Sequence, residues 1–215
     1  MTYAVKEIFY TLQGEGARTG RAAVFCRFAG CNLWSGREQD RETAQCRFCD
    51  TDFVGTNGKD GGKFDTAEDL AIKIASYWPD SRNGRPINKP YVVFTGGEPL
   101  LQLNNSLIKQ LQAIDFEVAI ETNGTLASLP GVDWICVSPK AGTRQILTEG
   151  HELKLVYPQE GIDPRTLEKQ QFGAYFVQPM DGPNYQANLK ACILFCQKNP
   201  IWRLSLQVHK ILGIP

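Results

Sequence analysis

The stretch that decides the fold class is residues 91–99, which read Tyr91-Val92-Val93-Phe94-Thr95-Gly96-Gly97-Glu98-Pro99. It begins with β-branched and aromatic residues, which is the composition of a strand, and it ends in a glycine pair followed by an acid. The first part is apolar throughout instead of alternating, which indicates a strand buried on both faces, as in a parallel sheet. The stretch therefore predicts a central strand that leads into a Gly-Gly-Glu turn.

Other segments of the chain have the same strand-like composition, and helix-like segments lie between some of them. The predicted strands are residues 5–11, 23–29, 117–121, 133–138, 152–157, 175–178 and 203–208, in addition to 91–95. The predicted helices are 66–77, 105–113, 163–171 and 185–198, the first with Thr66 and Asp69 as a capping box. Residues 59–63 are predicted to form a turn.

The alternation of strands and helices predicts an α/β fold with a mainly parallel sheet. The segments that follow Glu121 and Ser138 are too short, or too rich in glycine and proline, to form full helices. We therefore expect some crossovers to be loops. The polar stretch 32–45 reads either as a surface helix or as an ordered loop.

Length and composition place the chain among ordinary globular proteins. It has 215 residues, of which 42% are hydrophobic and 21% are charged, so we expect one domain over 1–215. No apolar run approaches membrane length, and the start of the chain lacks a secretory signal, so we expect a cytoplasmic protein. With 23 basic and 23 acidic residues, the chain has no net positive field to attract nucleic acid. A small-molecule substrate is the better expectation.

The chain has seven cysteines, and in a reducing compartment they read as ligands or core residues instead of disulfides. Cys136, Cys192 and Cys196 lie in apolar or helix-like segments, which favours core packing. Cys31, Cys46 and Cys49 form a C-x14-C-x2-C array. Three thiolates leave one iron of a 4Fe-4S cluster free for an external ligand, which is what a catalytic cluster needs.

A structural zinc site is the competing interpretation of the array. C-x2-C is also a common zinc half-site, and Cys26 with Cys31 would supply the other half. On spacing alone, zinc is favoured. The context favours the cluster, because a zinc ribbon needs neither a large α/β core nor a glycine-acidic loop after a buried strand.

Polar residues follow five of the predicted strands. In a parallel sheet the carboxyl ends of strands share one edge, and ligands bind there. We therefore expect these residues to converge on one pocket. They are Gln13 with Glu15, Gly96-Gly97-Glu98, Thr122-Asn123, Ser138-Pro139-Lys140 and Gln178-Pro179-Met180-Asp181.

The cysteine array together with Gly96-Gly97-Glu98 resembles the radical S-adenosylmethionine (SAM) superfamily. More closely, the chain resembles the 7-carboxy-7-deazaguanine synthase family, in its subgroup with an expanded cluster spacing. The segments that carry this resemblance are 9–16 (FYTLQGEG), 26–34 (CRFAGCNLW), 49–52 (CDTD), 121–124 (ETNG), 138–140 (SPK), 178–181 (QPMD) and the terminal Pro215. Residues 32–45 are then an insertion in the cluster-binding loop.

The resemblance implies a modified partial (β/α) barrel of the radical SAM type with a reduced number of helices. It implies a lyase that converts 6-carboxy-5,6,7,8-tetrahydropterin to 7-carboxy-7-deazaguanine and ammonia by radical ring contraction, in queuosine and 7-deazapurine biosynthesis. The implied cofactors are a 4Fe-4S cluster, S-adenosyl-L-methionine and Mg²⁺. The implied partners are a second copy of the chain in a homodimer and an electron donor such as a flavodoxin.

The resemblance also assigns residues. The cluster ligands are Cys31, Cys46 and Cys49, and Thr51 is the Mg²⁺ ligand. The cofactor-binding residues are Phe48, Asp50, Gly97, Ser138, Pro139, Lys140, Gln178, Pro179, Met180 and Asp181. The substrate-binding residues are Leu12, Gln13, Gly14, Glu15, Arg27, Thr95, Glu121, His209 and Pro215, with Arg27 suited to the substrate carboxylate because a guanidinium pairs with it in bidentate fashion. No protein residue is assigned as the radical source, because the cofactor supplies the radical.

Two alternatives remain at this point. Another short radical enzyme, such as an activase that forms a glycyl radical on a partner protein, would share the cluster and the glycine loop without the pterin contacts. A zinc-stabilised binding module would bind zinc and would not cleave S-adenosylmethionine.

Overall fold

The structure is a computed structural model that describes residues 2–79 and 89–215. Among these residues one sheet of nine strands runs in the order β3-β1-β2-β4-β5-β6-β7-β8-β9. The strands from β2 to β9 along this order are parallel, while β1 is antiparallel to both β2 and β3. The prediction of an α/β fold with a mainly parallel sheet is confirmed.

The strands are β1 (Tyr3–Leu12), β2 (Ala22–Phe28), β3 (Gly62–Phe64), β4 (Tyr91–Gly96), β5 (Glu117–Thr122), β6 (Trp134–Val137), β7 (Glu149–Tyr157), β8 (Gln171–Pro179) and β9 (Trp202–Leu204). The α-helices are α1 (Ala67–Ala75), α2 (Asn105–Ala113), α3 (Tyr185–Lys198) and α4 (Val208–Leu212). Short 3-10 helices are η1 (Gly16–Arg18), η2 (Glu38–Thr43), η3 (Pro99–Leu101) and η4 (Pro164–Lys169).

The helices are fewer than the strands because several crossovers lack one. The connections from β5 to β6 and from β6 to β7 contain no helix, as the sequence predicted, and η4 replaces the helix predicted over 163–171. The other predicted helices are confirmed, including the first, in which the Thr66 side chain accepts a hydrogen bond from the Asp69 amide. Within the described residues, no helix combines the length and the apolar character needed to cross a bilayer.

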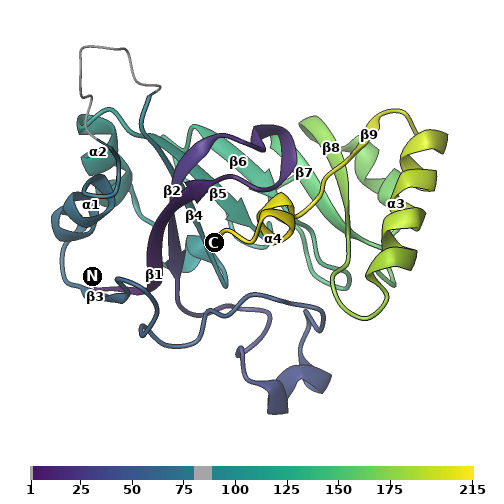
Figure 1. Cartoon of the computed structure of the whole chain (residues 1–215), viewed down its shortest axis with the longest axis horizontal. Helices are drawn as coiled ribbons and strands as arrows, with labels where there is room; N and C mark the ends of the chain where they lie inside the picture. The colour runs from purple at the N-terminus through teal and green to yellow at the C-terminus, as the bar shows by residue number, and fades with distance from the viewer. Residues whose placement is uncertain (1, 80–88) are drawn as a thin grey trace.

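Two sequence predictions at the sheet edges are right only in part. The turn predicted over 59–63 is confirmed at Lys59 and Asp60, and the chain then runs into β3, which pairs with Tyr3–Val5 at one edge. The predicted last strand, 203–208, stops at Leu204, because β9 is an edge strand paired only with β8 and the chain then turns away to form α4 at Val208. Figure 1 shows the consequence: α4 lies across the middle of the molecule, between α1 and α2 on one side and α3 on the other.

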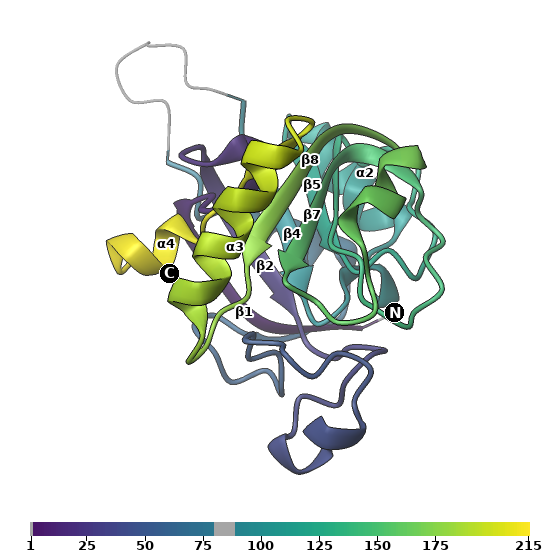
Figure 2. The same cartoon turned by 90° about the vertical axis from the view of Figure 1, so that its right-hand side faces the viewer.

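Successive side chains along each parallel strand point alternately into the core and onto the concave face of the sheet. One set of side chains, such as Phe94, Ile120 and Leu155, packs against α1, α2 and α3 and is fully buried. The alternate set, such as Thr95, Glu121 and Lys154, points to the other face. Figure 2 shows α3 alongside β8, with α4 and the end of the chain to the left of α3 in this view. The concave face and α4 therefore enclose the space in which a site can form.

Candidate active site

A cavity of about 350 Å³ lies on the concave face of the sheet. Its walls come from β1, β2, β4, β5, β6, β7 and β8, from the loop that carries Cys31, Cys46 and Cys49, and from the last residues of the chain. Segments distant in sequence therefore converge, as predicted from the polar strand ends.

One part of this convergence differs from the prediction. Gln13 and Glu15 follow β1, which is antiparallel to β2, so they do not lie at the shared carboxyl edge of the parallel strands. They enter the cavity from its other end. Gln13 Nε2 donates to the Glu121 carboxylate at 3.0 Å, and the Glu15 carboxylate pairs with Lys154.

The three cysteines of the predicted cluster all line the cavity. The Cys46 thiol donates a hydrogen bond to the Cys49 sulfur, and this bond lowers the pKa of Cys49 to about 6, while burial acts in the opposite direction. The pKa of Cys46, the donor, is raised. The Lys140 ammonium lies near both sulfurs and favours their anionic forms.

The other cysteines have different surroundings. Cys26 is fully buried on β2 within the core, where burial strongly raises its pKa, so it does not join Cys31 in a zinc half-site. Cys192 lies on the buried face of α3 within the core, with Cys196 of the same helix packed against that core, as predicted. Cys136 is buried on β6 but also lines the cavity, which its apolar sequence context did not indicate.

The donor set fits a 4Fe-4S cluster. Three thiols share one cavity wall with a buried lysine that offsets anionic charge. Within residues 2–79 and 89–215, no three His, Cys, Asp or Glu side chains converge closely enough to hold a single metal ion. A cluster does not need that convergence, because each thiolate binds a different iron atom.

The Gly-Gly-Glu turn is held against the cluster loop by close backbone contacts. A Cβ on Gly97 would lie 2.0 Å from the Gly30 oxygen and 2.7 Å from Cys31 Cβ, so only glycine fits there. Glu98 is fully buried and does not face the cavity. Its carboxylate accepts hydrogen bonds from Thr122 Oγ1 at 2.8 Å and from the Asn123 amide at 2.8 Å, which ties the turn to the end of β5.

Most of the predicted cofactor-binding residues line the same cavity. These are Phe48, Asp50, Gly97, Ser138, Lys140, Gln178, Pro179 and Asp181. Pro139 and Met180 are not among its lining residues. The Pro139 carbonyl accepts a hydrogen bond from Gln159, and the Met180 carbonyl accepts one from Asn188 at 2.9 Å. These bonds fix the backbone of the loops that follow β6 and β8.

Lys140 is held by the residue two positions before it. Its ammonium donates to Ser138 Oγ at 2.6 Å and to the Ser138 carbonyl at 2.8 Å. It also lies 5.8 Å from the centre of the Phe48 ring. Burial lowers the pKa of Lys140, which neighbouring cysteine thiolates partly counteract.

All nine predicted substrate-binding residues line the cavity: Leu12, Gln13, Gly14, Glu15, Arg27, Thr95, Glu121, His209 and Pro215. Arg27 lies on the concave face of β2, and its Nε donates to the Glu7 carboxylate at 2.8 Å. Glu7 also lines the cavity and was not predicted as a site residue. A half-buried arginine needs such a partner, which leaves the end of its guanidinium for an anionic ligand.

Lys154 is a site residue that the sequence reasoning missed. It lies on the concave face of β7 with its side chain only 6% exposed, paired with Glu15 and 3.4 Å from Glu121. These carboxylates raise its pKa even though burial lowers it, so Lys154 remains a cation. The signal was present in the run Leu153-Lys154-Leu155, because a charge between two core leucines on a strand must face the opposite side.

The end of the chain closes the cavity. The Val208 amide donates to the Gly14 carbonyl at 3.0 Å, and the Thr11 hydroxyl donates to a Pro215 oxygen at 2.9 Å. His209 packs so tightly on Gly14 that a Cβ there would lie 2.4 Å from His209 Nδ1. The terminal segment is therefore part of the site wall.

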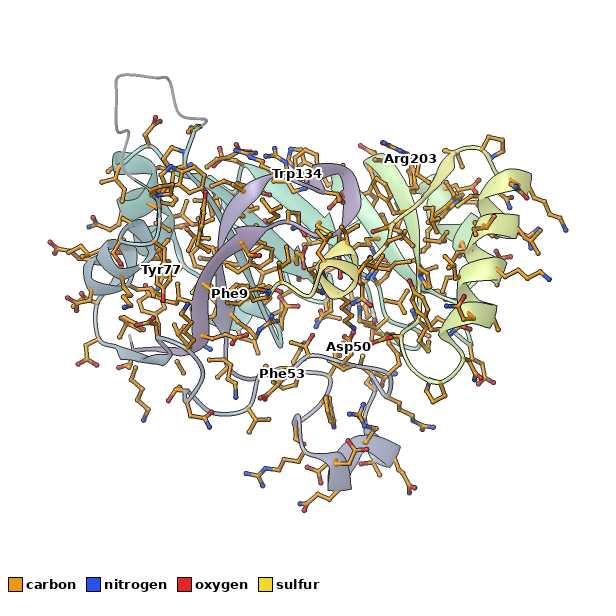
Figure 3. All side chains as sticks on the ribbon, viewed as in Figure 1. Phe9, Asp50, Phe53, Tyr77, Trp134 and Arg203 are labelled. Atoms are coloured by element: carbon orange, nitrogen blue, oxygen red, sulfur yellow. The ribbon has the colours of Figure 1, made fainter. Side chains whose placement is uncertain are left out.

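Lys210 is, after Glu7 and Lys154, a third site residue that was not predicted. Its ammonium lies 2.6 Å from Asp50 and 2.5 Å from Asp181, and so joins α4 to the cluster loop and to the loop after β8. Figure 3 shows Asp50 in this position, between the cluster loop and α4. Thr51 follows Asp50 in the cavity wall, and its amide donates to the Cys49 sulfur.

Comparisons with known proteins give relatives over the full length of the chain, although no family model matches it. The 7-carboxy-7-deazaguanine synthases of Bradyrhizobium diazoefficiens and Burkholderia multivorans are 58% identical over 214 and 215 residues, and that of Bacteroides thetaiotaomicron is 36% identical over 214. Each alignment covers 100% of both chains. The crystal structure of QueE from Escherichia coli superimposes with a TM-score of 0.68 at 28% identity, covering 97% of this chain and 95% of that one.

Proposed function

The chain belongs to the 7-carboxy-7-deazaguanine synthase family, and from that membership we propose how its residues share the work of a radical SAM enzyme. Its fold is the partial barrel of that family, with few helices. It is a lyase that acts on a small molecule in queuosine biosynthesis. The substrate that this family takes is 6-carboxy-5,6,7,8-tetrahydropterin, which loses ammonia as its ring contracts.

The observation that carries the proposal is one shared cavity. Cys31, Cys46 and Cys49 line it together with the Gly97 turn and with every residue assigned to the pterin. When bound, a 4Fe-4S cluster and S-adenosylmethionine supply a 5'-deoxyadenosyl radical. The protein's contribution is to hold the cofactor and the substrate next to each other and to exclude water.

The cofactor side of the cavity is the wall that carries Lys140. We assign Ser138, Lys140, Gln178 and Asp181 to the ribose and carboxylate of S-adenosylmethionine, and Phe48 to its adenine. The buried Lys140 ammonium supports this assignment, because it is placed to pair with an anionic group. The Gly97 backbone lines the cavity at the same end.

The substrate side is the wall formed by β1, β2 and β5. The Arg27 guanidinium, oriented by Glu7, is assigned to the substrate carboxylate. Glu121 is assigned to the amino-pyrimidine edge of the pterin, since an ionised carboxylate accepts hydrogen bonds from neighbouring N–H donors. Gln13 and Lys154 hold Glu121 in place, and Glu15 balances the charge of Lys154.

Further parts of the proposal rest on family membership and on the composition of the chain. Thr51 is assigned as a ligand of Mg²⁺, a cation that prefers oxygen donors. The oligomeric state is a homodimer, and the electron donor is a redox protein such as a flavodoxin. The compartment is the cytoplasm, and no nucleic acid takes part.

The function is tested by assembling the cluster anaerobically in the unmodified chain and in single Cys→Ser variants. Cys31→Ser, Cys46→Ser and Cys49→Ser are expected to lose bound iron and all cleavage of S-adenosylmethionine to 5'-deoxyadenosine. Cys192→Ser, which changes a cysteine in the core, is the control and is expected to keep both. Zinc in place of iron and sulfide, or cleavage that survives loss of the three cysteines, would reject the assignment.

A further inference from the structure

The insertion at 32–45 folds back on the loop that carries the cysteines. Its helix η2 projects away from the body in Figure 1, yet one of its side chains turns inward. Arg41 Nη1 donates to the Arg47 carbonyl at 2.8 Å and to the Cys49 carbonyl at 3.1 Å. Both carbonyls belong to the C-x2-C segment, residues 46–49.

The Arg41 side chain is itself fixed from two directions. Its Nε donates to both carboxylate oxygens of Glu38, at 2.8 and 2.9 Å. Its guanidinium lies 4.2 Å from the ring centre of Trp34, a distance at which the ring face attracts a cation.

The Trp34 ring that contacts the Arg41 guanidinium is itself held in place. The ring is 8% exposed, its Nε1 donates to the Arg37 carbonyl at 3.2 Å, and its edge meets the Phe53 ring with centres 5.6 Å apart. Trp34 and Phe53 both line the cavity. The guanidinium is thus held between the cavity wall and the carbonyls of the C-x2-C segment.

The C-x2-C segment forms no helix or strand with the rest of the chain, so its carbonyls lack the partners that regular structure provides. The guanidinium of an arginine is planar and its N–H donors have a fixed geometry, whereas the ammonium of a lysine is a point charge on a flexible stem. Holding the carbonyls of Arg47 and Cys49 fixes the backbone on either side of Phe48, and with it the direction in which Cys49 points.

We propose that Arg41 is a positioning residue of the cluster loop: the insertion supplies a guanidinium that holds the Cys46–Cys49 turn ready for the cluster. This inference rests on the proposed function, because it takes Cys46 and Cys49 to be cluster ligands. It gives the long Cys31–Cys46 spacing a physical purpose. This positioning role of Arg41 is distinct from its surface ion pair with Glu38, which by itself would contribute little to stability.

The test compares Arg41→Ala and Arg41→Lys with a matched control, Arg37→Ala. Arg37 lies in the same insertion, and no ion pair or side-chain hydrogen bond of its guanidinium is found among the described residues. Each chain is reconstituted anaerobically, its iron and sulfide are counted, and the rate at which a chelator removes the iron is followed by the loss of cluster absorbance. Thermal unfolding of the iron-free chains is measured in parallel.

Arg41→Ala is expected to release iron roughly tenfold faster than the unmodified chain, because it removes both charge-assisted hydrogen bonds to the loop carbonyls. Arg41→Lys should recover only part of this difference, and Arg37→Ala should behave as the unmodified chain. Equal rates of iron loss in all chains would overturn the proposal. So would a fall in the unfolding temperature of iron-free Arg41→Ala large enough to account for the faster loss, because the role would then be general stability. If the unmodified chain itself takes up no iron and sulfide, the proposed function fails first.

Discussion

The Lys210 ammonium lies 2.6 Å from the Asp50 carboxylate, which joins the last helix of the chain to the residue that follows Cys49. The same ammonium also pairs with Asp181 after β8. Three segments that are distant in sequence therefore meet at one cation above the cavity. The contact holds α4, and with it His209 and Pro215, against the cluster loop.

Removing this cation should loosen the cavity wall without disturbing the core. Lys210→Met is expected to raise the KM for the pterin roughly three- to tenfold and to change iron content little, because the pair is partly exposed and worth only about 1 kcal/mol. Steady-state kinetics with S-adenosylmethionine in excess measures the effect. Lys198→Met, an exposed lysine at the end of α3, is the control. Equal KM values for both variants would contradict a role of Lys210 in holding the cavity wall.

The same contact makes a prediction about pH. Hydrogen bonds from Lys210 lower the pKa of Asp181 below its ordinary value of 3.8. A group whose pKa is lower in the folded state stabilises the fold above its unfolded pKa, and this contribution disappears as pH falls through the folded value. The unmodified chain should therefore unfold at a higher temperature than Lys210→Met at neutral pH. The difference should shrink below about pH 4, and a difference that grows on acidification would contradict this assignment.

Lys154 should matter more for stability than Lys210, because it is almost completely buried. Lys154→Met leaves Glu15 and Glu121 without their cation and is expected to cost about 3–5 kcal/mol of unfolding free energy. Urea unfolding of the iron-free chain measures this cost. The double variant Lys154→Met with Glu15→Gln should recover part of it, since one uncompensated charge is removed. If the cost of the double variant equals the sum of the costs of the two single variants, Glu15 and Lys154 do not interact as the geometry indicates.

The position of Pro215 predicts that the chain end cannot be extended without loss. The Thr11 hydroxyl donates to a Pro215 oxygen at 2.9 Å, and Pro215 lines the cavity. A short Gly-Ser extension after Pro215 should lower turnover at least tenfold while iron and sulfide content stay unchanged. The same extension placed before Thr2 serves as the control. Full turnover with the extended end would mean that Pro215 does not reach the substrate.

Much of the site could be predicted from sequence because strand ends and motifs mark it directly. The run Tyr91–Gly96 with its glycine turn identified the central strand, and the cysteine spacing identified the loop beside it. Helices α2 and α3 were predicted with the bounds that the structure has, since their apolar faces and flanking turns are clear.

The parts that could not be predicted depend on pairing across long distances. The direction of β1 was not evident from its own residues, so Gln13 and Glu15 were expected at the wrong edge of the sheet. Residues 205–208 resemble a strand locally, and only the edge position of β9 ends the sheet at Leu204. Lys154 and Lys210 became site residues only when the structure supplied their acidic partners.

The most direct test of the account is anaerobic incubation of the reconstituted chain with 6-carboxytetrahydropterin, S-adenosylmethionine, Mg²⁺ and a reductant, followed by mass detection of the product. We expect 7-carboxy-7-deazaguanine to accumulate with repeated turnover, and we expect its formation to fall sharply in Arg27→Met, which cannot pair with the substrate carboxylate. A chain with an intact cluster that cleaves S-adenosylmethionine to 5'-deoxyadenosine yet forms no 7-carboxy-7-deazaguanine would contradict it.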